Sequence, residues 1–243
     1  MKLRSQQSQW NLLGRTDPLW AILTEPGRQN GGWTEEEFFA TGEREIAALM
    51  TAAESLGLPR KCKAALDFGC GVGRLTQAMA GRFETVTGVD IAPAMLEAAR
   101  RYNRHGDRCR YLLNEEDHLG EFADGAFDLV YSRITLQHVP PRHIRKYLAE
   151  LVRVTASGGL FVFQLPDSYR QWSDWLRHGI YRMVARRIFG AARVMEMYGI
   201  PKAEVVTLLE SHGARLLRVE EDPIAGKEWL SYRYFATRPD PAL

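Results

Sequence analysis

The residues best suited to chemistry lie in the run KAALDFGCGVGRLT, at positions 63–76. A short apolar strand is predicted to run into Asp67 and then into a turn that carries Gly69, Gly71 and Gly73. Such glycines let a backbone pass close to a bound ligand. The helix predicted next directs its free N–H groups and its positive dipole end to the same place. The pattern therefore predicts a cradle for a cofactor.

The sequence of this turn differs from the dinucleotide-binding fingerprint G-x-G-x-x-G. Counted from Gly69, the third glycine would stand where the chain has Arg74. That glycine permits close packing of helix on strand, which a large cation disfavours. Asp67 also precedes the first glycine by two residues. An anion there would repel a pyrophosphate but suits a cationic group such as an amine.

A second acid follows at a suitable distance. Residues 85–90 (TVTGVD) are predicted to form a strand, and Asp90 ends it, 21 residues after Gly69. In nucleotide-binding α/β units, an acid about 20 residues after the glycines accepts hydrogen bonds from ribose hydroxyls. The alternative role for Asp90 is to cap the helix that opens at Pro93.

These motifs resemble those of the class I S-adenosylmethionine-dependent methyltransferases, whose first motif reads V/L-L-D-x-G-C-G-x-G. The stretch FADGAFDLVYSRITLQHVPP (122–141) is similar to the fourth-strand region of the same family. The resemblance covers residues 60–166 firmly and the remainder loosely. It implies S-adenosylmethionine as the methyl donor and S-adenosylhomocysteine as the product.

The resemblance also implies roles for residues around the adenosyl group. Asp90 would hold the ribose, with Ile91 packing on the adenine and Met95 nearby. An acid or amide after a third strand at 111–113 would meet the adenine amino group. Asn114, Glu115 and Glu116 are all candidates for this contact because the stretch is one residue longer than the commoner form.

The amino-acid end of the cofactor needs partners of its own. Asp67 and the N–H groups of the turn would serve its amine and its carboxylate, and Cys70 would contribute only its backbone. Arg44, on the helix before the first strand, would either pair with that carboxylate or be a solvated helix arginine.

Ser132, at the end of the fourth strand, is expected to contact the cofactor, and a general base is expected in the segment that follows it. His138 is the first candidate, because its ordinary pKa near 6.5 suits proton transfer at neutral pH. The alternative is that His138 hydrogen-bonds the backbone and shapes the loop. Glu43, Tyr198 and His178 are weaker candidates.

Alternation of strands and helices predicts an α/β fold with a doubly wound, mostly parallel sheet and helices on both faces. The resemblance implies a Rossmann-like arrangement of seven strands, with the seventh antiparallel beside the fifth. Strands are expected at 159–166, 215–221 and 230–237, and helices at 42–56 and 201–212. Ligands of such sheets bind outside the carboxyl ends of the strands, where the candidate residues converge.

The chain is predicted to form a single methyltransferase domain over residues 1–243. An irregular, tryptophan-rich arm (1–41) would cover the cofactor, 42–166 would bind it, and 201–243 would complete the sheet. Between them, 167–200 would be a helical insertion. Residues 170–193 carry six arginines against one acid. This insertion would be a core-packing helix with a solvated face, a lid for an anionic or carrier-bound acceptor, or a nucleic-acid or membrane contact.

The composition of the chain bears on membrane spanning, metal binding and cellular location. The 243 residues are 45% hydrophobic, their formal net charge is +2, and no apolar stretch approaches the roughly 20 residues that span a bilayer. The three cysteines lack metal-ligand spacing, so we expect no metal, reduced thiols and a cytoplasmic location.

We therefore expect an enzyme, a monomer or homodimer, that methylates an oxygen or nitrogen of a small molecule. RNA methylation through the arginine-rich segment and a non-catalytic cofactor-binding partner protein are the alternatives. A nucleic-acid partner is disfavoured.

Overall fold

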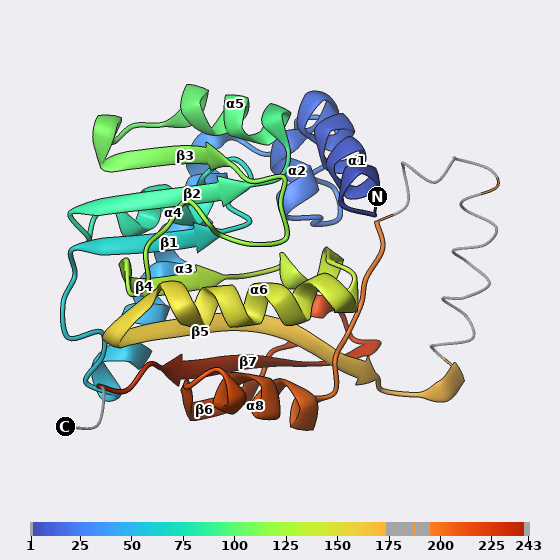
Figure 1. The fold of residues 1–243 in the computed structure, drawn as a ribbon. Coiled ribbons are helices and arrows are strands. Elements are labelled where there is room, and N and C mark those ends of the chain that lie inside the picture. Colours follow the sequence, from blue (N-terminus) through green and yellow to red (C-terminus); the bar gives the residue numbers. More distant parts are fainter. Residues whose placement is uncertain (1, 174–186, 188–194, 241–243) are drawn as a thin grey trace.

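The computed structural model describes residues 2–173, 187 and 195–240, and seven strands of these residues form one sheet (Figure 1). The sheet order is β3-β2-β1-β4-β5-β7-β6. The first five strands pair in parallel, whereas β7 is antiparallel to both β5 and β6. This confirms the expected fold class, including the antiparallel seventh strand beside the fifth. The strands are Ala64–Phe68 (β1), Thr85–Asp90 (β2), Cys109–Leu113 (β3), Phe127–Ser132 (β4), Thr155–Tyr169 (β5), Arg215–Glu221 (β6) and Trp229–Thr237 (β7).

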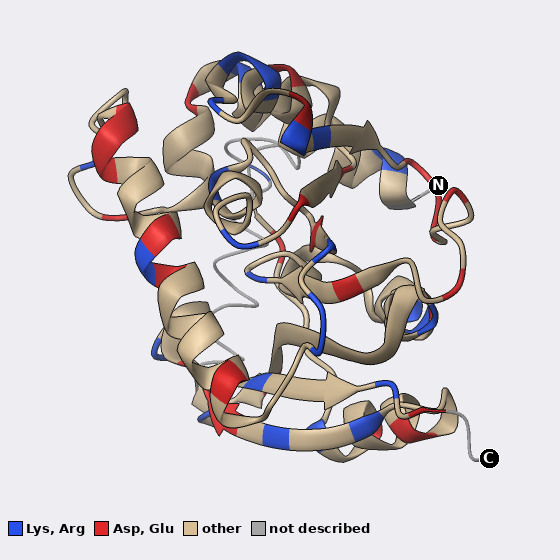
Figure 2. Ribbon diagram, turned by 90° about the vertical axis from the view of Figure 1, so that its left-hand side faces the viewer, with Lys and Arg blue, Asp and Glu red and all other residues tan. Residues whose placement is uncertain are grey.

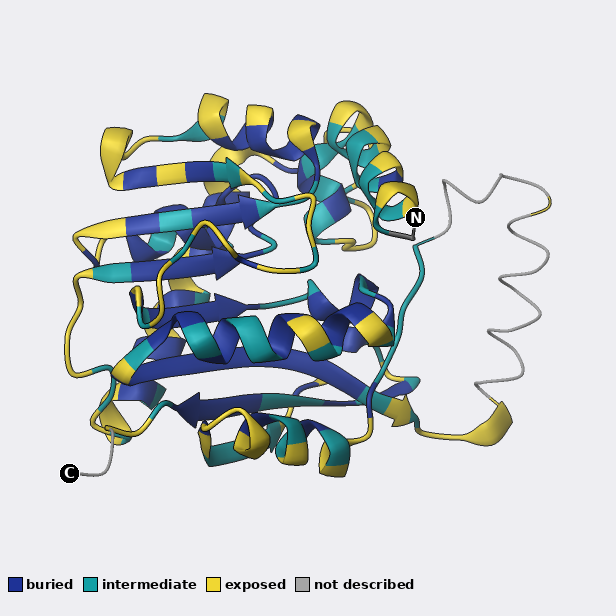
Figure 3. Ribbon diagram, viewed as in Figure 1, coloured by how far each residue is buried: buried dark blue, intermediate teal, exposed yellow. Residues whose placement is uncertain are grey.

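Helices cover both faces of the sheet. One buried cluster joins β1 and β5 to α3, α4 and α5, and another joins the opposite side of the same strands to α6 and α8. The division follows from alternation along a strand, where successive side chains point to opposite faces. In β5, Leu160 and Val162 belong to the first cluster, and Phe161 and Phe163 to the second. Figure 3 shows the central strands as the most deeply buried part of the chain. The helices are Glu35–Ser55 (α3), Arg74–Met79 (α4), Pro93–Tyr102 (α5), Pro141–Val154 (α6) and Lys202–Ser211 (α8).

The N-terminal arm is helical, which corrects the expectation of an irregular segment. Lys2–Thr16 forms α1 and Pro18–Ile22 forms α2, and both lie beyond the carboxyl ends of β1, β2 and β3 (Figure 1). The sequence of α1 is polar and does not indicate that one side of the helix is buried. This side packs against α5. Gly14 makes the contact close, because a Cβ there would lie 3.1 Å from the backbone nitrogen of Met95.

Two further boundaries differ from the sequence expectations. Helix α3 begins at Glu35 rather than at residue 42, because Thr34 caps it by accepting a hydrogen bond from the Glu37 N–H (3.2 Å). Strand β5 begins at Thr155 rather than at residue 159, and the Gly158–Gly159 pair falls where the β4–β5 register shifts. Among the described residues, no helix is long and apolar enough to cross a membrane.

Candidate functional site

A cavity lies at the carboxyl ends of β1, β2 and β4, beneath α1 and α2. It encloses about 960 Å³, part of which is open to solvent. Strand order reverses between β1 and β4 in such a sheet, which opens a crevice there. The lining comprises Leu3, Gln6, Trp10, Ala21, Ile22, Asp67, Phe68, Gly69, Cys70, Gly71, Arg74, Leu75, Val89, Asp90, Ile91, Met95, Asn114, Arg133, Ile134, Thr135, His138, Val139 and Tyr147. The site predicted from separate motifs is thus brought together in one place.

The glycine turn serves two purposes. Gly71 lines the cavity with φ of 53°, and a Cβ there would lie 2.3 Å from the Ile22 side chain of α2. Gly73 is not part of the lining; it caps α4 with φ of 81°, and a Cβ there would lie 2.5 Å from the Tyr111 hydroxyl. Gly73 therefore permits packing of the turn against β3, which is a different role from the ligand contact expected of it.

Asp90 ends β2 with its carboxylate in the cavity wall. One oxygen accepts a hydrogen bond from the Gly71 N–H (2.9 Å), and the other accepts one from the Ala92 N–H (2.8 Å). Burial raises the pKa of this carboxyl, although these backbone donors oppose the shift. An ionised carboxylate offers about four lone-pair sites, so acceptor capacity is left over for a ligand.

Asp67 is more enclosed, with 2% of its surface exposed. Its carboxylate accepts a hydrogen bond from the Thr76 hydroxyl at 2.6 Å. Burial raises its pKa to about 7, against the opposing effects of the Thr76 bond and of the Arg74 charge. A cation that entered the cavity beside Asp67 would favour the ionised form.

Asn114 is the one member of the predicted adenine-binding trio that lines the cavity. Its side-chain Nδ2 is buried and has no hydrogen-bond partner in the described part of the chain. Glu115 is instead exposed and accepts a hydrogen bond from Gln7 of α1. Ile91 and Met95 line the cavity as expected.

His138 reaches the cavity from the short helix Leu136–His138 (η2), but both of its ring nitrogens are occupied. Nδ1 lies 2.8 Å from the Glu196 carbonyl oxygen and must donate there, so Nε2 accepts from the Gln137 amide at 3.1 Å. The ring packs edge-on against Trp10. Burial lowers the pKa of His138 to about 4, which keeps the ring neutral at pH 7. These contacts suit the loop-shaping role better than that of a base.

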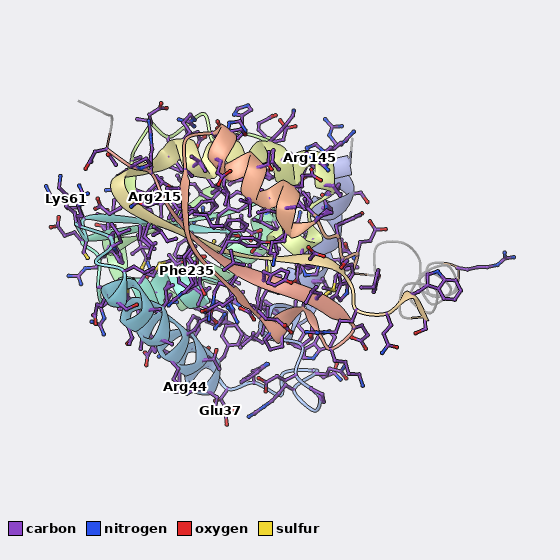
Figure 4. All side chains as sticks on the ribbon, turned by 90° about the horizontal axis from the view of Figure 1, so that it is seen from below. Glu37, Arg44, Lys61, Arg145, Arg215 and Phe235 are labelled. Atoms are coloured by element: carbon purple, nitrogen blue, oxygen red, sulfur yellow. The ribbon has the colours of Figure 1, made fainter. Side chains whose placement is uncertain are left out.

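Two residues expected at the site lie elsewhere. Ser132 is fully buried and donates a hydrogen bond to the Phe68 carbonyl oxygen (3.0 Å), which joins β4 to β1. Arg44 is exposed on α3 and is not in the cavity lining; Figure 4 shows it at the outer edge of the helix. The helical period places Glu45, and not Arg44, on the inner side of α3.

Two arginines that the sequence reasoning did not assign line the cavity instead. Arg74 follows the glycine turn directly, and Arg133 follows β4 directly. Both contact Glu45 of α3, at 2.8 Å and 3.1 Å. Burial opposes the charge on Glu45, but the two guanidinium groups hold its pKa below the usual range. The sequence pattern uses Arg74 only as evidence against a dinucleotide, although its position directly after the turn is a signal for a site residue.

Helix α1 closes the mouth of the cavity by bridging its two sides. Gln7 donates to the Ile91 carbonyl oxygen (3.1 Å), and Asn11 accepts from the Ala94 N–H (2.9 Å), both on the β2–α5 side. On the β4–α6 side, Gln6 donates to the His138 carbonyl oxygen. Helix α1 therefore lies across the mouth of the cavity.

Most of the arginine-rich segment at 170–193 lies outside the described residues. Within the described ranges, no group of three or more His, Cys, Asp or Glu residues could hold a metal ion. Figure 2 shows charged bands near the start, the middle and the end of α3, separated by uncharged stretches, and Glu45 contacts both cavity arginines.

Comparison with known proteins identifies the fold and the domain. A family model described as a methyltransferase domain matches residues 66–163. The chain is 35% identical over 112 residues to a ubiquinone biosynthesis O-methyltransferase of Idiomarina loihiensis, and 36% identical over 123 residues to a malonyl-[acyl-carrier protein] O-methyltransferase of Serratia marcescens. These alignments cover 45% and 46% of this chain. They span 45% of each relative, which is less than half of its length.

The likeness in structure extends further along the chain. The crystal structure of magnesium protoporphyrin IX methyltransferase from Synechocystis PCC 6803, with bound S-adenosylhomocysteine, has a TM-score of 0.66 with this chain. The match covers 98% of this chain and all of the other at 17% identity, so it is a likeness of fold.

Proposed function

We propose that this chain, whose residues 66–163 form a methyltransferase domain of the class I S-adenosylmethionine-dependent family, methylates an oxygen or nitrogen of a small molecule. The proposed donor is S-adenosylmethionine, bound in the cavity at the carboxyl ends of β1, β2 and β4. We further propose that residues 1–243 form one domain, in which α1 and α2 cover the cofactor.

The spare acceptor capacity of Asp90 is the observation that carries this proposal. Its carboxylate is fixed by the N–H groups of Gly71 and Ala92, so it cannot turn away when a ligand enters. Its remaining lone pairs match two neighbouring ribose hydroxyls, which are donors. The residues present therefore fit the adenosyl group.

Other lining residues fit the remainder of the same molecule. The unpartnered Nδ2 of Asn114 and the apolar side chains of Ile91 and Met95 suit an adenine ring. Asp67 suits the cofactor amine, because a cation beside it would offset the burial that raises its pKa. Cys70 is buried behind the turn and is proposed to contribute only its backbone.

The chemistry leaves the chain mainly a positioning task. When bound, S-adenosylmethionine supplies an activated methyl group on a sulfonium. The chain must hold an acceptor in line with that group and exclude water, and such positioning is worth roughly 7–11 kcal/mol. Helix α1 supports exclusion of water by closing the cavity. We propose His138 as a positioning residue, because its neutral ring holds η2 to the Glu196 backbone.

The acceptor is proposed to be a small molecule, free or bound to a carrier. The two relatives named above are O-methyltransferases of ubiquinone biosynthesis and of a malonyl group on acyl-carrier protein. All three cysteines are free, which supports a proposed cytoplasmic location. A monomer or a homodimer remains the proposed state.

Methyl transfer can be tested by incubating the protein with S-adenosylmethionine labelled in the methyl group and a bacterial metabolite extract. We expect label in molecules below about 1 kDa, or in carrier protein, in a nuclease-resistant form. The Asp90→Ala variant should transfer much less label. Glu97→Gln, an exposed change on α5, is the matched control and should behave as the wild type.

Two results would contradict the proposal. Label that nuclease releases would indicate an RNA acceptor. Tight binding of S-adenosylhomocysteine without transfer to any fraction would indicate a non-catalytic cofactor-binding protein.

A further inference from the structure

Two guanidinium groups flank one carboxylate beside the cavity. Arg74 Nη2 lies 2.8 Å from Glu45 Oε2, and Arg133 Nε lies 3.1 Å from Glu45 Oε1. The three side chains come from α4, from the residue after β4 and from α3, which are far apart in sequence. Only 4% of the Arg74 side chain and 11% of the Arg133 side chain are exposed.

Further partners fix both arginines in place. Arg133 donates from Nη1 and Nη2 to the two oxygens of Asp222, at 2.6 Å and 3.2 Å. Arg74 donates from Nη1 to the Thr41 hydroxyl at 3.2 Å. Glu45 also accepts from the Tyr131 hydroxyl at 2.8 Å. A planar guanidinium group whose Nη atoms are held in this way is pre-organised for further hydrogen bonding.

One nitrogen of each guanidinium group is left without a hydrogen-bond partner among the described residues. The Nε atoms of Arg74 and Arg133 are buried and have no hydrogen-bond partner in the described part of the chain. Arg133 Nε is close to Glu45, but the direction of its N–H does not make a hydrogen bond. A buried charged donor without an acceptor is unfavourable. Because both residues line the cavity, a ligand can supply the missing acceptors.

The balance of charges around the two arginines favours a monoanionic ligand over a dianionic one. The two guanidinium groups are matched by the carboxylates of Glu45 and Asp222. Arg233 lies 3.7 Å from Asp222, but it is paired with Glu220 at 2.6 Å, so these ion pairs balance before a ligand binds. A dianion such as a phosphate would bring two uncompensated charges into a buried site, whereas a monoanion brings one. Paired N–H donors of arginine suit carboxylates and phosphates alike, so the charge balance is what favours a carboxylate.

We propose that Arg74 and Arg133 together bind a carboxylate group of a ligand in this cavity, a role that rests on the proposed methyltransferase function. The carboxylate has two possible sources. It belongs either to the amino-acid part of the cofactor or to the methyl acceptor, whose carboxylate oxygen would then attack the methyl carbon. In the second case the carbon–sulfur bond breaks as the oxygen–carbon bond forms, the electron pair stays on sulfur, and no proton has to leave.

Calorimetry with two probes tests the cofactor source. S-adenosylmethionine and decarboxylated S-adenosylmethionine differ only in the carboxylate, so the ratio of their Kd values isolates its contribution. In the wild type we expect the decarboxylated probe to bind at least about tenfold more weakly. Arg74→Met and Arg133→Met should reduce this ratio about tenfold or more. Arg82→Met, at an exposed arginine after α4, is the matched control and should keep the ratio.

The design separates binding from folding. A purely structural role would weaken both probes equally and leave the ratio unchanged. Arg74→Lys keeps the charge but has no Nε–H fork, and it should lie between the wild type and Arg74→Met. The double variant Arg74→Met/Glu45→Gln removes both members of the pair, so no carboxylate is left in excess. It should fold and still lose the preference.

A second arm tests the acceptor source. Protein saturated with S-adenosylhomocysteine is titrated with the monoanions benzoate and monomethyl malonate, and product labelled in the methyl group is treated with mild alkali. A carboxylate acceptor predicts binding of a probe that Arg133→Met abolishes, together with label released as methanol from a methyl ester. Either positive arm supports the proposal. Equal ratios in all variants, with no probe binding and no alkali-labile product, would overturn it. Failure of the wild type to bind either adenosyl compound would instead contradict the proposed function.

Discussion

At the scale of single residues, Asp67 and Asp90 are carboxylates near the ends of neighbouring strands, Asp67 buried and Asp90 half-buried, and their partners differ. Asp90 is held by two backbone donors, which favour its charge. Asp67 has the Thr76 hydroxyl as its hydrogen-bond partner, and burial raises its pKa to about 7. The ionised form of Asp67 is therefore the more dependent on a cationic ligand.

Asp67 should make stability depend on pH. The folded chain holds its proton up to about pH 7, whereas the ordinary pKa is 3.8. Between these values the folded state binds more protons, so the free energy of unfolding falls as pH rises. Asp67→Asn removes this titration. Relative to the wild type, the variant should gain about 2–3 kcal/mol between pH 5 and pH 8.

Denaturant unfolding at four pH values measures this difference. Asp107→Asn, an exposed change, is the control and should show no trend with pH. A difference between Asp67→Asn and the wild type that stays constant from pH 5 to pH 8 would contradict the assigned pKa shift.

His138 should act through structure. His138→Ala removes its hydrogen bonds to the Glu196 carbonyl and the Gln137 amide, so the free energy of unfolding should fall by about 1–3 kcal/mol. Loss of a general base lowers turnover by about 10²- to 10⁴-fold. We expect a smaller effect on kcat, under about tenfold, and no break near pH 6.5 in the wild-type kcat profile. A hundredfold loss of kcat at unchanged stability would restore His138 as the base.

At the residue level, the sequence indicates which residues lie together where spacing carries the information. Asp67, Gly71 and Asp90 stand at fixed distances along one strand–turn–helix–strand unit, and all three line the cavity. Arg74 and Arg133 were not assigned, because what places them is contact with Glu45 and Asp222 from distant elements. Local patterns do not reveal such long-range pairing.

At the scale of elements, the polar sequence of α1 does not predict the helix that the structure has there. Its sequence has no strong apolar period, and its docking comes from Gly14 and from side-chain hydrogen bonds to backbone atoms of other elements. The N-terminus of α3, by contrast, can be predicted from the sequence. Thr34 followed three residues later by Glu37 is the usual signature of a helix N-terminus.

Asn11 should determine how firmly α1 covers the cavity. Asn11→Ala removes the acceptor for the Ala94 N–H in the first turn of α5, a loss worth about 1 kcal/mol. Hydrogen exchange of the α1 amides should become about fivefold faster, since 1 kcal/mol corresponds to that factor. Ser8→Ala, whose hydroxyl bonds only within α1, is the control. Equal exchange in Asn11→Ala and the wild type would argue against this anchor.

At the scale of the whole molecule, the strand order was predictable because alternating strands and helices admit few arrangements. The antiparallel β7 came from the family resemblance and not from periodicity. The irregular start of β5 was not predicted, because it depends on the shifted pairing of β4 with β5. Tertiary pairing decided that boundary.

A ligand that bridges several elements should stabilise the entire fold. S-adenosylhomocysteine at 100 times its Kd should raise the free energy of unfolding by about 2.7 kcal/mol. For a chain of 243 residues this corresponds to an increase in Tm of about 5–10 °C. Differential scanning calorimetry measures this increase, with adenosine monophosphate as the control ligand. An unchanged Tm would contradict binding in the folded cavity.

Calorimetric titration of S-adenosylhomocysteine into the wild type and Asp90→Ala tests the central claim most directly, with circular dichroism to verify that the variant is folded. We predict one bound molecule per chain and at least about tenfold weaker binding by Asp90→Ala, because ribose hydroxyls lose a charged acceptor. Equal affinity of the two proteins, or no binding by the wild type at millimolar ligand, would contradict the account.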